Sequence, residues 1–353
     1  MKKKKIFIVI PKYKIGGAEK VMANLANELI KYDLEIFFIT LTKSNKIILD
    51  KNIHLINLKS DKVFNSIIKL KNLINELEPD LCFSTISHTN IALFIASKLA
   101  KHNCKIFLRE SNNLFKSLNT KNFLYKFFFL KLVKISYKNS TLITPSKRLS
   151  NSLKKKFKLN EKVYTLNNPI ISRKVNYSLT KNFDFISVGS LSYQKDHLTL
   201  LKAFKVAILK KNKIKLMIIG EGSFKKKILK YISDYNLKKN IKVLPNQKNL
   251  FKYLNQSKNF VLSSRYEGYP NVLLDAAIAK LPIISTNCEF GPSEILQDEK
   301  YGKMFEVGDY IKLSKIMLDN HKIKIIPKKE LEKNNIKIIT KKYYELFFKK
   351  NTK

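Results

Sequence analysis

The sequence predicts an α/β protein of two domains, each built around a parallel β-sheet. Its 353 residues exceed what one hydrophobic core usually holds, so two domains are expected. Short apolar runs of strand length alternate with segments of helical period along the whole chain. This alternation is typical of buried parallel strands with helices on both faces of the sheet.

The first domain is predicted at residues 1–166. Its apolar runs predict buried strands at residues 6–10, 35–41, 53–58, 81–84, 105–108 and 141–144. Apolar side chains that recur every three or four residues predict helices at residues 18–30, 63–77, 90–100 and 146–157.

The pattern restarts after Asn168-Pro169, because the residue before a proline disfavours helix and a polar stretch follows. We therefore place a linker at residues 167–181 and the second domain at residues 182–325. Its predicted strands are residues 183–188, 215–219, 241–244, 260–262 and 282–285. Its predicted helices are residues 196–209, 224–235, 250–255 and 272–279. Residues 326–353 form a separate C-terminal segment, with a helix at about 328–349.

The chain is strongly basic, with 69 Lys and Arg against 27 Asp and Glu, a formal net charge of +42. Compositional drift toward Lys, Ile and Asn explains most of this excess, because the lysines are spread over both halves. Attraction to an anionic membrane surface is an added consequence. Nucleic-acid binding ranks last, because the sequence has no zinc finger, helix-turn-helix pattern or aromatic RNA-binding motif.

Cysteine usage and hydropathy bear on the compartment. The three cysteines are widely spaced and form no CxxC pair, so neither a disulfide framework nor a zinc site is implied. The apolar run at residues 6–10 is too short for a signal peptide, and no stretch is apolar enough to span a bilayer. We therefore expect a cytoplasmic protein.

The most informative stretch is residues 263–277, where a buried strand gives way to a Gly-Pro turn and a helix. Pro270 fits the first turn of that helix, where its missing N–H is of no consequence. The N–H groups of Asn271 and Val272 then point out of the helix start, which favours a phosphate group. Glu267 precedes this position and Asp275 lies about one turn inside the helix, so two carboxylates flank a diphosphate site.

This stretch resembles the E-x7-E signature of retaining glycosyltransferases of family 4, which have the GT-B fold. Here it reads E-x7-D, with the shorter acid second. The resemblance implies two Rossmann-like domains that face each other across a cleft, with the C-terminal helix able to pack back on the first domain. It implies that Glu267 positions the donor sugar and that Asp275 binds ribose. Further donor contacts carried over are Gly268, Tyr269, Pro270 and Asn271.

Two other motifs match the family in order. Gly16 and Gly17 resemble its Gly-Gly loop, which lies close to the donor phosphates, and a tight connection is the alternative reading. Residues 188–204 resemble its G-R-L-x-x-x-K-N segment, which makes Lys195 the cation that holds the diphosphate. Ser190 stands where the family has Arg, so a bidentate phosphate donor is missing, and Asp196 replaces Asn.

Weaker matches complete the second domain. The turn at residues 220–222 resembles the family's G-x-G turn at a strand end, and residues 291–309 follow its G-P-x-E-I-L tail. Asn246 and Gln247 lie in the loop that touches the base in relatives, and they are candidate contacts for uracil.

Acceptor-side candidates lie in the first domain. Arg109, Glu110 and Asn112 end a predicted strand where relatives have a polar cluster, and a structural ion pair is an equal alternative. His88 follows the preceding strand, although a lone histidine is more often structural. Residues 123–138 mix a wide apolar face with lysines, next to the lysines at 154–156. They predict either an interfacial patch on a membrane or a core helix with solvated lysines.

The resemblance implies transfer of a hexose or N-acetylhexosamine, with retention, from a nucleotide-sugar, UDP-linked, to a glycan or polyprenyl-diphosphate-linked acceptor in polysaccharide biosynthesis. Catalysis would rest on Glu267 and Lys195, with no metal or other cofactor. The enzyme would be peripheral on the inner face of the cell membrane. Three alternatives stay open: a nucleotide-sugar epimerase of the same fold, a basic nucleic-acid-binding protein, and an inactive scaffold.

Overall fold

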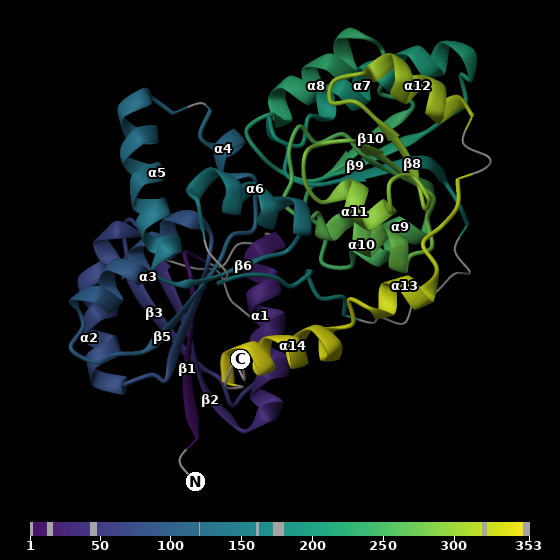
Figure 1. The fold of residues 1–353 in the computed structure, drawn as a ribbon. Coiled ribbons are helices and arrows are strands. Elements are labelled where there is room, and N and C mark those ends of the chain that lie inside the picture. Colours follow the sequence, from purple (N-terminus) through teal and green to yellow (C-terminus); the bar gives the residue numbers. More distant parts are fainter. Residues whose placement is uncertain are drawn as a thin grey trace. The chain divides into compact units, whose positions relative to one another are not determined.

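The chain folds into two compact units in a computed structural model (Figure 1). The structure describes residues 3–12, 17–42, 48–119, 121–159, 162–171, 180–319 and 323–348. The first unit comprises Met1–Pro169 together with Asn334–Lys353, and the second comprises Ile170–Lys333.

A sheet of parallel strands forms the first unit, in the order β3-β2-β1-β4-β5-β6-β7. The strands are β1 (Lys4–Ile10), β2 (Leu34–Thr42), β3 (His54–Ser60), β4 (Leu81–Thr85), β5 (Lys105–Arg109), β6 (Thr141–Thr144) and β7 (Val163–Thr165). In β1, which lies between β2 and β4, Ile8 pairs with Phe38 of β2 and Phe83 of β4, and all three side chains are fully buried. The continuous apolar runs of the sequence are therefore strands covered on both faces.

Helices of the first unit cover this sheet. They are α1 (Gly17–Leu29), α2 (Ile67–Leu77), α3 (Ser87–Leu99), α4 (Leu114–Ser117), α5 (Phe123–Lys138), α6 (Lys147–Phe157) and α14 (Ile336–Phe348), with short 3₁₀ turns at Ile30–Tyr32 and Phe64–Ser66. The last helix, α14, packs beside α1. Its Phe347 ring lies 4.7 Å from the Phe107 ring and 5.3 Å from the Phe83 ring, so the C-terminal helix completes the core of the first unit.

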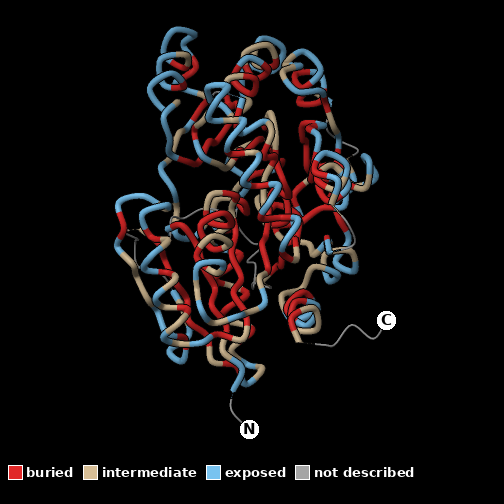
Figure 2. The backbone as a smooth tube through the Cα atoms, turned by 60° about the vertical axis from the view of Figure 1, so that its left-hand side comes forward, coloured by how far each residue is buried: buried red, intermediate tan, exposed pale blue. Residues whose placement is uncertain are grey.

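The second unit has a parallel sheet in the order β10-β9-β8-β11-β12-β13. Its strands are β8 (Phe183–Val188), β9 (Leu216–Ile219), β10 (Ile241–Leu244), β11 (Ser257–Leu262), β12 (Ile283–Thr286) and β13 (Lys303–Phe305). Its helices are α7 (His197–Lys210), α8 (Lys225–Asp234), α9 (Leu250–Asn255), α10 (Asn271–Ile278), α11 (Pro292–Leu296), α12 (Tyr310–Leu318) and α13 (Lys328–Glu332). Separate apolar clusters cover its two faces, and Figure 2 shows the buried residues concentrated inside each unit.

The predicted α/β class with two Rossmann-like parallel sheets is confirmed. The short strands β7 and β13 were not predicted, because three-residue runs carry too little periodicity. The helix expected at 328–349 is two helices, α13 and α14. They are separated at Asn335, whose side chain accepts a hydrogen bond from the Lys337 N–H at 2.9 Å and so starts the second helix.

The boundaries between units differ from the predicted linker at 167–181. Asn168 is buried in the first unit, where its side-chain oxygen accepts a hydrogen bond from Arg109, while Ile170 packs in the core of the second unit. Residues 172–179 lie outside the described residues. The segment at 326–333, predicted to leave the second domain, stays in it because Ile326 is buried in the same core.

Candidate functional site

The strand order of the second sheet marks one position as a ligand site. The chain adds β9 and β10 on one side of β8, and then β11, β12 and β13 on the other side. The loops that follow β8 and β11, residues 189–196 and 263–270, therefore leave the same edge in opposite directions. Open α/β sheets bind ligands at such a switch point, beyond the carboxyl ends of the strands.

Hydrogen bonds hold these two loops together. The Arg265 N–H donates to the Gln194 carbonyl at 2.7 Å, and the Gln194 side-chain amide donates to the Tyr266 carbonyl at 3.0 Å. The Ser263 hydroxyl donates to the Lys195 carbonyl at 2.9 Å. The loops are thus fixed to each other by hydrogen bonds to backbone carbonyls, and the side chains they carry are held in register.

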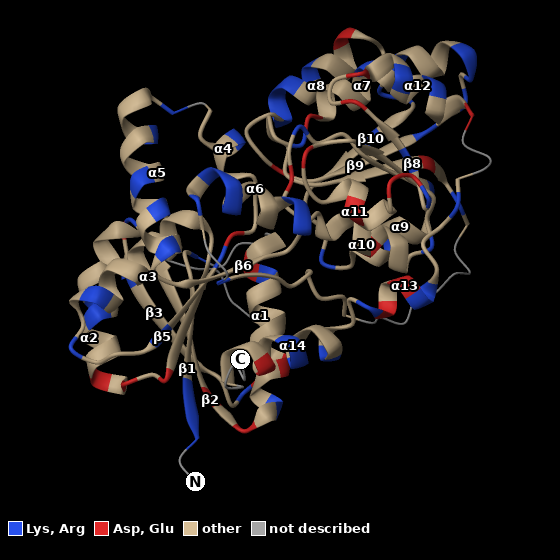
Figure 3. Cartoon of the chain, viewed as in Figure 1, with Lys and Arg blue, Asp and Glu red and all other residues tan. Residues whose placement is uncertain are grey.

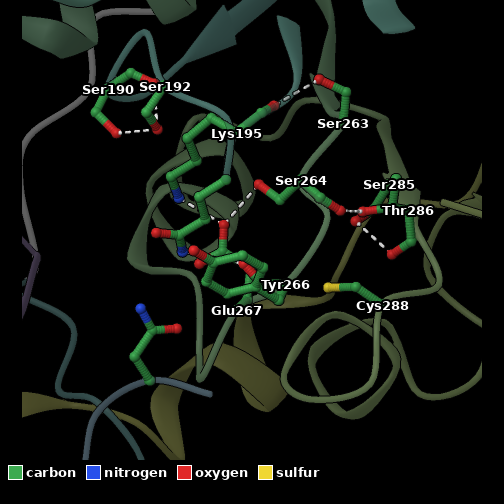
Figure 4. A network of polar contacts seen from close by, with 12 residues as sticks. Ser190, Ser192, Lys195, Ser263, Ser264, Tyr266, Glu267, Ser285, Thr286 and Cys288 are labelled. Atoms are coloured by element: carbon green, nitrogen blue, oxygen red, sulfur yellow. Dashed lines mark hydrogen bonds and ion pairs between the residues drawn. The ribbon is translucent and has the colours of Figure 1, made fainter. Parts of the chain in front are cut away.

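Lys195 and Glu267 form an ion pair at the centre of this arrangement, although they are 72 residues apart in sequence. Lys195 Nζ lies 2.5 Å from Glu267 Oε1, and the Ser264 hydroxyl donates to the same oxygen at 2.6 Å (Figure 4). The side chains are 16% and 7% exposed, so this is a largely buried, charge-assisted contact. A Cβ on Gly189 would lie 3.3 Å from the aliphatic carbons of Lys195, so the glycine leaves room for the lysine side chain to pass over the backbone.

Asp196 has a structural role. It adopts a left-handed backbone conformation with φ of 45°, is buried, and accepts a hydrogen bond from the Thr199 hydroxyl at 2.8 Å. Its carboxylate pairs with Arg265 at 2.8 Å. The guanidinium of Arg265 also lies 4.6 Å from the centre of the Tyr193 ring. Position 190 carries only a small hydroxyl, exposed and 3.1 Å from the Ser192 hydroxyl.

Sequence reasoning missed Ser264 and Arg265. Ser264 lies three residues before Glu267 in the same turn, but a serine in a turn carries no specific signal. Arg265 did carry one: the chain has only four arginines among its 69 basic residues. Because this chain otherwise uses lysine, an arginine beside a candidate motif indicates a contact that needs the planar guanidinium, such as a buried carboxylate.

The turn before α10 is held from behind by the loop after β12. Pro270 is the residue that caps α10, one position earlier than predicted, and the helix begins at Asn271. Gly291 has φ of 92°, and a Cβ there would lie 2.6 Å from Pro270 Cδ and 2.8 Å from the Gly268 carbonyl oxygen. The two segments therefore touch through backbone, which fixes the direction in which α10 starts.

Other donor-side candidates have different surroundings. The Tyr269 side chain is buried in the core of the second unit, so it anchors the turn. Asp275 is half-buried in the second turn of α10. Asn246 and Gln247 follow β10 at the same edge of the sheet. The Asn246 amide lies 3.4 Å from Glu221, and Gln247 accepts a hydrogen bond from the Tyr253 hydroxyl at 2.9 Å.

The Gly-Gly loop belongs to the first unit. Gly17 is the first residue of α1, and Gly16 lies outside the described residues. His88 lies in the first turn of α3, directly after β4. Strands β1 and β4 are neighbours and form the switch point of the first sheet, because β2 and β3 lie on one side of them and β5 to β7 on the other. Burial and the nearby charge of Lys12 lower the pKa of His88, so the imidazole is more often neutral.

Arg109 and Glu110 are both buried, and their side chains take different partners. Arg109 donates to the Thr85 hydroxyl at 3.3 Å and to Asn168, near the end of the first unit. Its packing is therefore internal to the unit.

The carboxylate of Glu110 accepts hydrogen bonds from the Ser87 and Tyr137 hydroxyls at 2.5 and 2.6 Å. Burial raises the pKa of Glu110, and these hydrogen bonds partly oppose that rise. Asn112 is half-buried, and its N–H donates to the same carboxylate at 3.2 Å. These hydrogen bonds tie the ends of β4 and β5 together, and the acceptor-side role of Arg109, Glu110 and Asn112 stays a prediction.

Comparison with known proteins shows what this chain is similar to. The family model for glycosyl transferases group 1 matches residues 170–337, which include the whole second unit. An uncharacterized glycosyltransferase of Methanocaldococcus jannaschii is 33% identical over 257 residues, which is 67% of this chain and 63% of that protein. The match thus spans less than two thirds of that relative's length.

A second relative matches over more of its length. It is the N-acetylgalactosamine-N,N'-diacetylbacillosaminyl-diphospho-undecaprenol 4-alpha-N-acetylgalactosaminyltransferase of Campylobacter jejuni, 27% identical over 332 residues and 88% of each chain. Among solved structures, TarM of S. aureus has a TM-score of 0.81 at 15% identity, with 98% of each chain covered. A TarM mutant was solved in complex with UDP and alpha-GlcNAc-glycerol. The likeness in structure shows the GT-B fold.

Proposed function

We propose that this chain, whose residues 170–337 match the family model for glycosyl transferases group 1, is a glycosyltransferase. We propose that it transfers a hexose or N-acetylhexosamine from a UDP-sugar to a glycan or lipid-linked acceptor. We further propose that transfer retains the anomeric configuration, as the resemblance of residues 267–275 to the family 4 signature suggests.

The contact between Lys195 and Glu267 carries this proposal. It joins a cation and a carboxylate at the switch point of the second sheet, beside the start of α10. A diphosphate needs the cation and the helix start, and a sugar hydroxyl needs the carboxylate. This position, beyond the carboxyl ends of β8 and β11, is where open α/β sheets bind ligands.

The chemistry assigns a role to each group. The bond between the anomeric carbon and the diphosphate oxygen breaks, and the acceptor oxygen bonds to that carbon on the same face. The acceptor proton passes to the departing diphosphate. Lys195 and the first N–H groups of α10 stabilise the charge that develops on the diphosphate, which is the main electrostatic task. Glu267 orients the donor sugar, and Ser264 orients Glu267.

The substrate classes follow from the relatives. The Campylobacter jejuni relative is named for a diphospho-undecaprenol acceptor, and TarM was solved with UDP. We therefore propose that the acceptor is a polyprenyl-diphosphate-linked or surface glycan. We also propose that the enzyme acts at the inner face of the cell membrane. Because Lys195 and the helix start provide positive charge, we propose that transfer needs no metal ion and proceeds unchanged in EDTA.

Titration calorimetry with UDP, GDP and a panel of UDP-sugars tests the donor site. We expect UDP to bind, and Lys195→Met to weaken UDP binding about tenfold or more, because a charge-assisted phosphate contact is lost. We expect Glu267→Gln to leave UDP affinity within about threefold while donor hydrolysis and transfer fall by about two orders of magnitude or more.

The second unit offers a matched control. Lys258 and Asp184 form an ion pair at 2.9 Å between the amino ends of β11 and β8, the opposite edge of the same two strands. Lys258→Met and Asp184→Asn should change neither UDP affinity nor turnover. Failure of the wild type to bind any uridine or guanosine diphosphate compound would refute the proposed function, and unchanged UDP affinity in Lys195→Met would remove this lysine from the phosphate site.

A further inference from the structure

Helix α5 of the first unit exposes an apolar face that no described part of the chain covers. Seven of the twenty exposed large apolar side chains among the described residues lie on this one 16-residue helix. Phe123 is 79% exposed, Leu124 66% and Phe128 58%. We call the α5 face the set Phe123, Leu124, Phe127, Phe128, Leu132 and Ile135, with Lys131, Lys134 and Lys138 among them.

The exposed α5 face is separate from the side of α5 that packs into the core of the first unit. The side of α5 that packs on the unit is a different set, with Phe129, Val133 and Tyr137 buried at the spacing of one helical face. That inner side packs beside α3. Leu124, Phe128 and Leu132 recur every four residues on the opposite side, so they form a continuous exposed stripe. The inner side of α5 therefore belongs to the core, and the membrane patch expected for residues 123–138 stays a prediction for the exposed side.

The charge of α5 has one sign. The helix carries Lys126, Lys131, Lys134 and Lys138 and no Asp or Glu, as Figure 3 shows. Long lysine side chains can lie along apolar groups while the ammonium stays at a polar boundary. An apolar stripe with lysines beside it suits a surface that is apolar inside and anionic outside.

A lipid surface fits this face better than a second copy of the chain. Two copies meeting through α5 would bring lysine against lysine with no acidic residue on the helix to neutralise them. Among the described residues, no helix is long and apolar enough to cross a membrane, and α5 itself is 16 residues with four lysines. A helix of this composition lies in the plane of the interface.

We propose that the α5 face docks on a bilayer containing anionic lipids, with its aromatic side chains at the acyl boundary and its lysines at the lipid phosphates. The inference rests on exposure and charge alone and does not depend on the proposed sugar transfer. Vesicles without donor or acceptor therefore test it separately.

The chain has no tryptophan, so a single one can report insertion. We expect Phe128→Trp to show a blue-shifted emission on vesicles of phosphatidylglycerol and phosphatidylcholine, and quenching when brominated lipid is used. The control is Leu209→Trp, because Leu209 is 81% exposed on α7 in the second unit. Its emission should not change. Equal shifts at both positions, or none at position 128, would overturn the proposal.

Vesicle flotation distinguishes binding through the α5 face from attraction by the net positive charge of the whole protein. We expect Lys131→Gln/Lys134→Gln/Lys138→Gln to weaken binding to anionic vesicles about tenfold or more. The control triple on α8 removes the same charge from exposed lysines, Lys225→Gln/Lys226→Gln/Lys227→Gln, and should weaken binding less than about threefold. Equal losses in both triples would mean attraction by net charge and would overturn the assignment to α5.

The apolar contribution needs its own pair of variants. Leu124→Gln/Phe127→Gln/Phe128→Gln should reduce vesicle binding at least tenfold without lowering Tm, because these side chains are exposed. The control Leu209→Gln/Ile311→Gln replaces scattered exposed apolar residues and should not reduce it. A wild type that self-associates through α5 but does not bind vesicles would point to a second copy and refute the proposal.

Discussion

The ion pair between Lys195 and Glu267 gives a prediction about stability that needs no substrate. At 2.5 Å and an effective dielectric constant of about 20, Coulomb attraction between the two charges is about 6–7 kcal/mol. Desolvation of two ions offsets most of this energy. Breaking the pair from one side leaves a buried charge behind, so we expect Lys195→Met to lower the free energy of unfolding by about 3 kcal/mol.

A double-mutant cycle isolates the contact. With both charges removed, Lys195→Met/Glu267→Gln should be more stable than the sum of the two single changes implies, by about 2 kcal/mol. The measurement is urea unfolding followed by circular dichroism. The pair of Lys258 and Asp184 is the control: Lys258 is 56% exposed, so its coupling should stay below about 1 kcal/mol. Additive effects of Lys195→Met and Glu267→Gln, within about 0.5 kcal/mol, would refute the pairing.

Four further predictions follow from the site and its support. Ser264→Ala removes the hydroxyl 2.6 Å from Glu267, so kcat/KM should fall about tenfold with UDP affinity within about threefold, as kinetics and calorimetry can measure. Gly291→Ala should lower both UDP affinity and Tm, because its Cβ would meet Pro270. Gly308→Ala has the same backbone strain, with φ of 88°, but no clash, so it should lower Tm less than Gly291→Ala and leave UDP affinity unchanged. Burial and the charge of Lys195 lower the pKa of His197 to about 3, so its contribution to stability is present above pH 6.5 and is lost as pH falls toward 3. His197→Gln should therefore remove a slope of about 1.4 kcal/mol per pH unit from urea unfolding below pH 6.5, and an unchanged slope would contradict the assignment. Transfer measured in EDTA should equal transfer in added magnesium, and a dependence on the ion would contradict a site whose positive charge comes from Lys195.

The candidate site was predictable in its parts. The strand, turn and helix start at residues 257–278 are encoded locally, because the apolar run, the Gly-Pro pair and the helical period lie within one short stretch. Lys195 was named as a phosphate-binding residue from a motif. Its contact with Glu267 could not be predicted from either motif alone, because it depends on β8 and β11 being neighbours in the sheet.

The polar residues of the first unit show the opposite case. Arg109, Glu110 and Asn112 lie at the end of a strand, at the edge where ligands bind, so the sequence offered two equal alternatives for them, an acceptor-side site and a structural ion pair. The structure buries Arg109 and Glu110 and satisfies them with Thr85, Asn168, Ser87 and Tyr137, partners that lie 23 to 59 residues away in sequence. Burial of a polar side chain is decided by what packs over it, and that information is absent from the local sequence.

By itself the sequence determined the alternation of strand and helix, the two parallel sheets and the turn that precedes α10, because backbone preference and hydrophobic period act over a few residues. Tertiary structure alone decided the order of the strands, the partner of each charged side chain and the side of α5 that stays exposed. These features depend on contacts between segments far apart in the chain. Their free energies depend on burial and distance, and both exist only once the units have folded.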